Sequence, residues 1–158
     1  MELARLHDLV DIRETALGAA PGEARLTVGR DTTHRIVTTG AGPDQTARME
    51  ILDCALDGQV PILAKLDVEG YELEVLRGAA VTLASLKLKA VLIEDGSAPV
   101  VEVLRGGGFK LYGYDAFGRR LVSPDSHKSA NHLFIRDETF VRSRLVEAPS
   151  IHVLGVKL

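Results

Sequence analysis

Two carboxylates that directly follow an apolar run are the residues best placed for chemistry in this sequence. Val60–Leu66 is apolar except for one lysine, and Asp67 and Glu69 come next, two positions apart. A third carboxylate, Glu94, ends the next continuous apolar run, Lys89–Ile93. In an open α/β sheet the carboxyl ends of the strands are where ligands bind. If both runs are strands, acidic chemistry is expected at this edge of the sheet.

Three interpretations of Asp67 and Glu69 are open at this point. They can belong to a reaction centre, or they can be solvated carboxylates at the polar end of an ordinary strand. Their D-x-E spacing also matches a magnesium-binding pair, but a phosphoryl-transfer enzyme would need a phosphate cradle, and the sequence contains none that we can identify. Lys65, alone in its apolar run, is expected to form a structural ion pair with a nearby carboxylate.

The other residues that carry chemistry show no comparable pattern. The five histidines lack the close spacing of zinc ligands, so we predict no metal site. Cys54 is the only cysteine, which excludes an internal disulfide, and no histidine or strongly basic residue nearby would activate it as a nucleophile. Gly106–Gly108 follows a predicted helix rather than a strand, which indicates a helix end rather than a phosphate-binding loop.

The elements that must position the carboxylates alternate between strand and helix. Val60–Leu66 is expected to be a buried strand, and Leu73, Leu76, Ala80 and Leu83 then recur at the spacing of one helix. A strand at Lys89–Ile93, a helix at Val100–Leu104 and strands at Phe109–Tyr114 and Asn131–Arg136 follow. This order predicts an α/β fold with parallel strand pairs in the middle.

The flanking segments carry weaker patterns. Met1–Val10 is expected to be a short helix, and Asp11–Leu17 with Ala24–Val28 is expected to form a hairpin. Gly29–Arg48 is polar and is predicted to be a surface loop with at most one irregular strand at Arg35–Thr38. Met49–Leu56 fits a strand and a helix equally well. The link Asp115–Ala130 is polar, and the segment beyond Phe140 shows no clear pattern.

Composition limits the class of protein. With 158 residues the chain fits a single domain, and a net charge of -3 gives no electrostatic reason to expect nucleic acid or an anionic membrane as a partner. Aromatic residues make up 4% and tryptophan is absent, which argues further against base stacking. Charged residues near Met1 exclude the apolar core of a signal peptide, and no apolar run reaches membrane-spanning length. A cytoplasmic location is expected.

Several short motifs together resemble the FkbM family of S-adenosylmethionine-dependent methyltransferases. They are K-L-D-V-E-G-Y-E from Lys65, then V-L-R-G-A, V-L-I-E, G-F and N-H-L-F-I, in this order. Upstream, A-L-G from Ala16 and G-E-A-R-L from Gly22 resemble the third strand and following hairpin of that family. The resemblance covers essentially the whole chain, and the K-x-D-V-E-G block is its specific part. It implies a partial class I (Rossmann-like) methyltransferase sheet, mostly parallel with an antiparallel last strand.

The resemblance also implies a reaction and its residues. S-adenosylmethionine would be the cofactor and the hydroxyl group of a small metabolite or sugar the methyl acceptor. Asp67 would lie beside the point of transfer with Glu69 on the same side of the strand, and either could take or orient the hydroxyl proton. Glu94 would line the acceptor side, or only cap the following turn. Thr15, Ala16 and Leu17 would border the adenine, with Asp67 nearby, or would only be a strand end.

Compared with complete family members, the chain lacks the first two strands and their glycine-rich loop. We therefore expect residues 1–158 to be one N-terminally truncated domain, in which Ile62–Asp67 becomes an edge strand. Either Asp11–Leu17 moves in to pair with that edge, or a second chain covers it and the protein is a homo-oligomer. The rival functional interpretation is a non-catalytic α/β module that keeps the scaffold but has lost cofactor binding.

Overall fold

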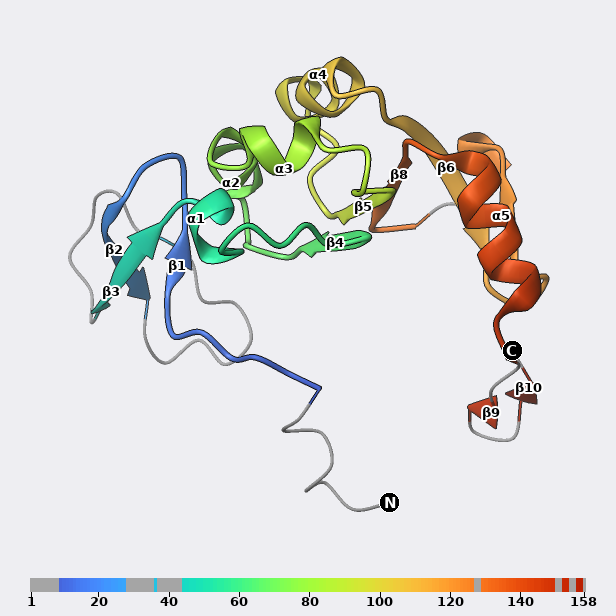
Figure 1. Cartoon of the computed structure of the whole chain (residues 1–158), viewed down its shortest axis with the longest axis horizontal. Coiled ribbons are helices and arrows are strands. Elements are labelled where there is room, and N and C mark those ends of the chain that lie inside the picture. Colours follow the sequence, from blue (N-terminus) through green and yellow to red (C-terminus); the bar gives the residue numbers. More distant parts are fainter. Residues whose placement is uncertain are drawn as a thin grey trace.

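The computed structural model describes residues 9–27, 36, 44–126, 129–149, 152–153 and 156–157, which form a mixed α/β fold (Figure 1). Its main sheet has five strands in the order β4-β5-β8-β6-β7. Their bounds are Leu63–Leu66 for β4, Ala90–Ile93 for β5, Lys110–Asp115 for β6, Arg120–Val122 for β7 and His132–Ile135 for β8. The strands predicted around Lys89–Ile93, Phe109–Tyr114 and Asn131–Arg136 are therefore confirmed, while β7 lies in the polar link Asp115–Ala130, where no strand was predicted.

The strand directions confirm one part of the expected sheet and correct another. The late strand β8 is antiparallel to both of its neighbours, β5 and β6, as expected of the last strand. The sheet is not mostly parallel, because β4–β5 is its single parallel pair and β6–β7 is antiparallel as well. Since β8 lies between β5 and β6, the strands β4, β5 and β6 nevertheless run in the same direction.

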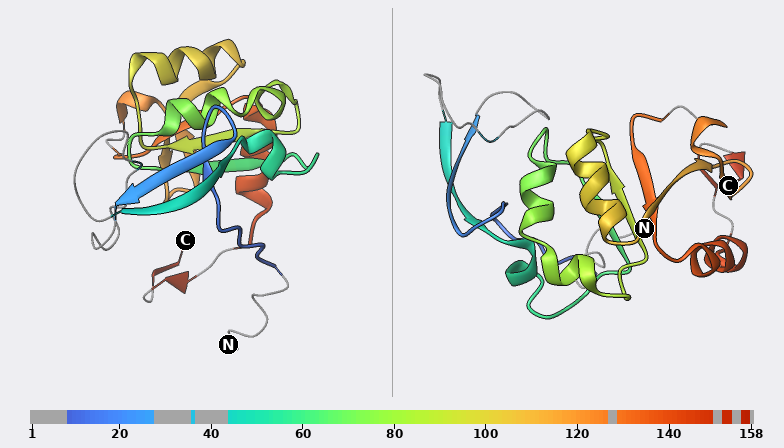
Figure 2. Two further views of the ribbon diagram at one scale, coloured as in Figure 1. Left: turned by 90° about the vertical axis from the view of Figure 1, so that its left-hand side faces the viewer. Right: turned by 90° about the horizontal axis from the view of Figure 1, so that it is seen from above.

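Three helices cover one face of this sheet: α2 (Glu72–Arg77), α3 (Ala80–Ala84) and α4 (Ala98–Gly106) (Figure 1, Figure 2). Alternate strand residues point to this face and form the main core with the helices, among them Leu66, Ile93 and Phe134. The helix α5 (Glu138–Glu147) packs through Val141 and Leu145 against a second cluster that contains Ala90, Leu121 and Ile135. The far face of the sheet is therefore covered on its β8–β6–β7 side.

The helix predictions are partly right. The helix expected after Gly70 is divided into α2 and α3 by Gly78 and Ala79. The helix at Val100–Leu104 is confirmed within α4, which ends at Gly106 with Gly107 as its C-cap, so the three glycines do end a helix. The segment beyond Phe140 is not irregular, because α5 continues to Glu147. Most of the helix predicted at Met1–Val10 lies outside the described residues.

A second sheet of three strands lies at one end of the molecule (Figure 1). Its order is β1-β3-β2, and the bounds are Ala16–Leu17 for β1, Gly22–Thr27 for β2 and Asp44–Glu50 for β3. The predicted hairpin between Asp11–Leu17 and Ala24–Val28 is wrong, because β1 pairs with β3 in parallel and β2 pairs with β3 in antiparallel fashion. The predicted loop also contains most of β3.

The segment Met49–Leu56, which fitted a strand and a helix equally well, contains part of each: it begins with the end of β3 and continues into the short helix α1 (Leu52–Ala55). Of the irregular strand predicted at Arg35–Thr38, the described residue Ile36 forms an isolated bridge with Leu26. A final antiparallel pair, β9 (His152–Val153) and β10 (Val156–Lys157), stands apart from both sheets in the pairing. None of the helices in the described part of the chain has the length and apolar character needed to cross a membrane.

The strand β4 lies at the edge of the sheet, as expected for Ile62–Asp67. It is shorter than the predicted strand Val60–Leu66, and Ile62 is 59% and Leu63 is 56% exposed rather than buried. Asp11–Leu17 does not pair with this edge, because β1 pairs with β3 instead. Within the described residues β4 pairs with β5 alone. Coverage of the edge by a second chain stays a prediction.

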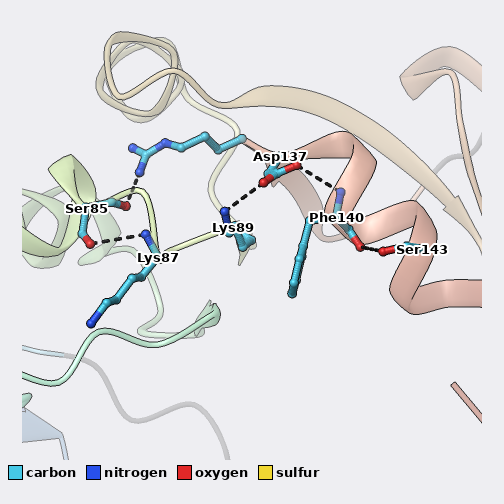
Figure 3. A network of polar contacts seen from close by, with 7 residues as sticks. Ser85, Lys87, Lys89, Asp137, Phe140 and Ser143 are labelled. Atoms are coloured by element: carbon cyan, nitrogen blue, oxygen red, sulfur yellow. Dashed lines mark hydrogen bonds and ion pairs between the residues drawn. The ribbon is translucent and has the colours of Figure 1, made fainter. Parts of the chain in front are cut away.

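Polar side chains fasten the ends of the helices to their neighbours. The Asp53 carboxylate accepts hydrogen bonds from the backbone N–H groups of Val81 and Thr82, both at 2.8 Å, and from the Thr82 hydroxyl at 2.6 Å, at the start of α3. At the start of α5, Asp137 accepts from the Phe140 N–H at 3.0 Å and pairs with Lys89 at 2.8 Å (Figure 3). The first set of contacts joins α1 to α3, and the second joins the start of α5 to the residue before β5.

Arg136, directly after β8, joins two helix ends. Its guanidinium donates to the carbonyl oxygens of Leu83 and Ser85 at the end of α3, and to that of Gly107 at the end of α4, with Nε 3.0 Å from the Gly107 oxygen. The same group lies over the Phe109 ring, 4.2 Å from its centroid. Partial burial lowers the pKa of Arg136, which still leaves it protonated at neutral pH.

Candidate functional site

A cleft of about 710 Å³ lies between the small sheet and the end of β4. Most of its walls come from three segments that are far apart in the sequence: the approach to and residues of β1, most of β3, and the two residues after β4. Leu26 of β2 and Ile36 complete the lining. The lining residues are Arg13, Glu14, Thr15, Ala16, Leu17, Leu26, Ile36, Gln45, Thr46, Ala47, Arg48, Asp67 and Val68. The cleft therefore brings Thr15, Ala16 and Leu17 together with Asp67.

Backbone contacts hold the β1 wall in place. The Thr15 hydroxyl donates to the Arg48 carbonyl oxygen at 3.0 Å, and β1 is in parallel register with the end of β3. After β1, Gly18 lies directly against Gly78, where a Cβ on Gly78 would be only 2.1 Å from the Gly18 oxygen. Because Gly78 has no Cβ, the backbone after β1 can come this close to the junction of α2 and α3. The small sheet is thereby docked beside the main one.

Asp67 faces away from the helices that cover the sheet. Leu66 is buried among those helices, and side chains alternate along a strand, so Lys65 and Asp67 share the opposite face. Their contact confirms this, because Lys65 Nζ lies 2.6 Å from Asp67 Oδ2. The ion pair expected of Lys65 is thus present, with the two side chains 52% and 45% exposed.

Glu94 lies next to Asp67, because each residue directly follows the carboxyl end of its strand. Leu66 and Ile93 are partners in the parallel ladder, and Asp67 and Glu94 are the next residues on the two strands. The hydrogen bond to Asp67 and the attraction of its charge raise the pKa of Lys65. Desolvation opposes them, and the charge of Glu94 raises the pKa by a smaller amount than desolvation lowers it. Glu94 is near enough to act on Lys65, although it does not line the cleft.

The turn after β5 is held by a residue that the sequence did not single out. Asp95 Oδ1 accepts from the Ser97 N–H at 2.7 Å, and Asp95 Oδ2 accepts from the Ser97 hydroxyl at 3.0 Å. This is the local side-chain turn that aspartate and serine commonly form before a helix. The capping role considered for Glu94 therefore belongs to Asp95.

Glu69 does not lie where the extended pattern placed it. Its φ is +51° and that of Gly70 is +94°, so the chain turns sharply after Val68 and the alternation that would put Glu69 beside Asp67 ends there. A left-handed conformation is uncommon for a residue with a side chain and marks a tight turn. Glu69 is not among the residues that line the cleft. Its place in the reaction stays a prediction.

Several residues that line the cleft were not predicted from the sequence. Gln45, Thr46 and Arg48 lie on β3, in a segment that was predicted to be mostly loop. Arg13 precedes β1, donates to the Ala55 carbonyl oxygen and pairs with Asp11 at 3.1 Å. No sequence motif marks these residues, and their position depends on the long-range pairing of β3. In the described ranges, no group of three histidine, cysteine or acidic residues could hold a metal ion.

Comparison with known proteins agrees with this architecture. The family model described as the methyltransferase FkbM domain matches residues 14–131 of the 158-residue chain. The match therefore includes β1, β4 and all the residues that line the cleft except Arg13, and it ends directly before β8. No curated protein and no solved structure matches the chain significantly. Because the match spans well over half of its length, the chain belongs to the FkbM methyltransferase family.

Proposed function

We propose that the protein is an S-adenosylmethionine-dependent methyltransferase that acts on a hydroxyl oxygen of a small metabolite or sugar. The observation that carries this proposal is the cleft, in which Thr15, Ala16, Leu17 and Asp67 lie together. Family membership supplies methyl transfer as the general reaction. The cofactor, the oxygen acceptor and the role of each residue are parts of the proposal.

The cleft residues fit such a cofactor in size and in chemistry. A volume of about 710 Å³ lies within the range of roughly 300–1,000 Å³ that is usual for small-molecule sites. Leu17, Leu26 and Ile36 offer an apolar wall for the adenine, while Glu14 and Asp67 offer carboxylates to its positively charged groups. Arg48 suits the cofactor's own carboxylate. When bound, S-adenosylmethionine supplies the methyl group on a cationic sulfur.

Asp67 is the residue that we assign to proton removal. A hydroxyl oxygen must lose its proton as it forms a bond to carbon, and a carboxylate within hydrogen-bond reach can take that proton. Asp67 lies on the cleft wall at the end of β4, beside Glu94 on the next strand. The acceptor would lie on this side of the cleft, near both carboxylates. Holding the acceptor in line with the methyl group would supply most of the rate.

The cofactor part of the proposal is tested by calorimetric titration with S-adenosylhomocysteine. We expect saturable binding by the wild-type protein and a dissociation constant raised about tenfold by Asp67→Ala, through loss of a charged contact of about 1.4 kcal/mol. Asp125→Ala, in the exposed 3₁₀ turn far from the cleft, should bind like the wild type. A folded protein that does not bind would contradict the proposal and favour the non-catalytic module.

The reaction is tested with methyl-tritiated S-adenosylmethionine and a panel of hydroxylated probes: monosaccharides, methyl glycosides, inositol and short hydroxy acids. Asp67→Asn keeps the shape of the side chain but cannot accept the proton as a base. We expect it to lower kcat by about 10²- to 10⁴-fold while it still binds S-adenosylhomocysteine. An active Asp67→Asn variant would assign proton removal to another group.

A further inference from the structure

Lys65 is the one described residue that forms a hydrogen bond to the Asp67 carboxylate. The bond joins Lys65 Nζ to Oδ2 at 2.6 Å. Leu66, between the two residues, is buried in the core and is the last residue of β4, so Lys65 lies in the strand and Asp67 directly follows it. The ammonium and the carboxylate therefore meet at the end of the strand. Among the described residues, no hydrogen bond to Oδ1 of Asp67 is found.

A second carboxylate stands beside this ion pair. Glu94 follows Ile93 at the end of β5, in register with Asp67, and its charge acts on Lys65. The three side chains form a cluster with one positive and two negative charges. The cleft walls nearby add Arg13, which is paired with Asp11, together with Glu14 and Arg48.

We propose that Lys65 is a positioning residue of the methyl-transfer site, which holds Oδ2 of Asp67 so that Oδ1 is presented to the acceptor hydroxyl. The proposal rests on the function proposed above. It gives Lys65 a role through Asp67 and no contact with the reacting atoms. A carboxylate held at one oxygen by a charged hydrogen bond has a defined orientation, whereas a free aspartate at an exposed strand end samples several rotamers.

Glu94 adds a second negative charge that acts on the ammonium, while the ion pair of Lys65 is with Asp67. Before transfer, the three groups carry a net charge of one negative unit. When the hydroxyl proton moves to Asp67, that carboxyl becomes neutral and the net charge becomes zero. The charge of Glu94 then still favours the ammonium form of Lys65.

The contact itself is tested by ¹⁵N NMR of the lysine ammonium groups in the free protein. In the wild type, the Lys65 ammonium should titrate at a higher pH than an ordinary lysine, because both carboxylates stabilise its charged form. Asp67→Asn should lower that midpoint strongly and Glu94→Gln should lower it less, since Glu94 acts only through its charge. A midpoint that neither variant moves would mean that the cluster does not exist in solution.

The role is tested by comparing Lys65→Met, which keeps most of the side-chain length, with Lys65→Arg, which keeps the charge and its hydrogen bond. Both should fold, because the side chain is half exposed, and both should bind S-adenosylhomocysteine with wild-type affinity. We expect Lys65→Met to lower kcat about 10- to 100-fold at unchanged KM, since an unpositioned base loses part of its usual effect. The acidic limb of its kcat profile should move to higher pH, and Lys65→Arg should restore both.

Each other outcome has a distinct meaning. Wild-type kcat and pH profile in Lys65→Met would overturn the positioning role and leave the proposed function intact. Loss of S-adenosylhomocysteine binding in Lys65→Met would assign Lys65 to the cofactor instead and would also overturn it. A wild-type protein that transfers no methyl group to any probe would refute the proposed function, and the role of Lys65 with it.

Discussion

Replacing Arg136 with lysine tests whether one side chain holds two helices on the sheet. The guanidinium of Arg136 reaches the carbonyl oxygens at the end of α3 and, at the same time, that of Gly107 at the end of α4. A lysine keeps the charge but carries its donors on a single atom, so it cannot serve both helix ends. The substitution therefore removes the connection and not the charge.

The expected loss follows from the contacts that a lysine cannot replace. A hydrogen bond to a charged group contributes about 1.5–3 kcal/mol, and at least one helix end loses its donor. Stacking of the cation on Phe109 adds about 0.5–1 kcal/mol at a partly exposed site. Water can replace part of these contacts, because the side chain is only partly buried. We expect the free energy of unfolding to fall by about 2–3 kcal/mol.

Thermal and urea unfolding, followed by circular dichroism, measure this loss. For a chain of this length about 2–3 kcal/mol corresponds to a fall in Tm of roughly 4–12 °C. The matched control is Arg105→Lys, on an exposed position in the last turn of α4, which should change the stability by less than about 0.5 kcal/mol. If Arg136→Lys proved as stable as the wild type, water would suffice for these carbonyl groups and the connection would not stabilise the fold.

Two further substitutions test buried and capping carboxylates. Asp53→Ala should lower the free energy of unfolding by about 1–2 kcal/mol at pH 7, because three donors at the start of α3 lose their acceptor. Desolvation raises the pKa of Asp53, but the hydrogen bonds from Thr82 and Val81 together outweigh it and leave the pKa lowered. The stabilisation by Asp53 is therefore present above the unfolded-state pKa and is lost as the pH falls through the folded-state pKa. Urea titrations should therefore show the wild type and Asp53→Ala converging below about pH 4, and a constant gap would contradict the assignment. Glu72 is 1% exposed and its Oε2 has no hydrogen-bond partner among the described residues, so Glu72→Gln should raise the free energy of unfolding by about 1–2 kcal/mol in the same assay. A loss of stability would instead show that Oε2 accepts a bond that an amide cannot replace.

Sequence patterns succeeded where both faces of an element are covered. The continuous apolar run Lys89–Ile93 was predicted as a strand, and β5 lies between α4 on one face and the α5 cluster on the other. The helix at Val100–Leu104 was found because its apolar residues recur on one face. Three glycines then mark its end. At these positions local pattern and tertiary burial agree, so periodicity alone identifies the elements.

The N-terminal hairpin failed because strand pairing is not a local property. Ala20-Pro21-Gly22 is turn-forming, which makes pairing of the two flanking segments the natural expectation. Both segments pair instead with β3, which begins at Asp44 and is too polar to be read as a strand. The missed cleft residues on β3 follow from the same error. Resemblance to a family, rather than spacing, is what placed Thr15–Leu17 near Asp67.

Exposure and local conformation caused the remaining errors. An apolar run such as Val60–Leu66 is the same in a central strand and at an edge, and only the neighbours decide which it is. The sequence of α5 was missed because its apolar residues do not gather on a single face. Glu69 was placed by assuming that the strand continues, and the left-handed turn at Glu69 and Gly70 has no signal beyond the glycine.

The position of β8 has a consequence for the order in which the chain can assemble. β8 pairs with β5 on one side and with β6 on the other, although both of those strands come earlier in the chain. Until the ribosome has released residues 132–135, the β4–β5 pair and the β6–β7 hairpin have no ladder in common. The nascent chain therefore carries two separate pieces of sheet, each with an open edge that can attract other chains. A chain that stops before His132 cannot form the continuous sheet, however well its earlier strands fold.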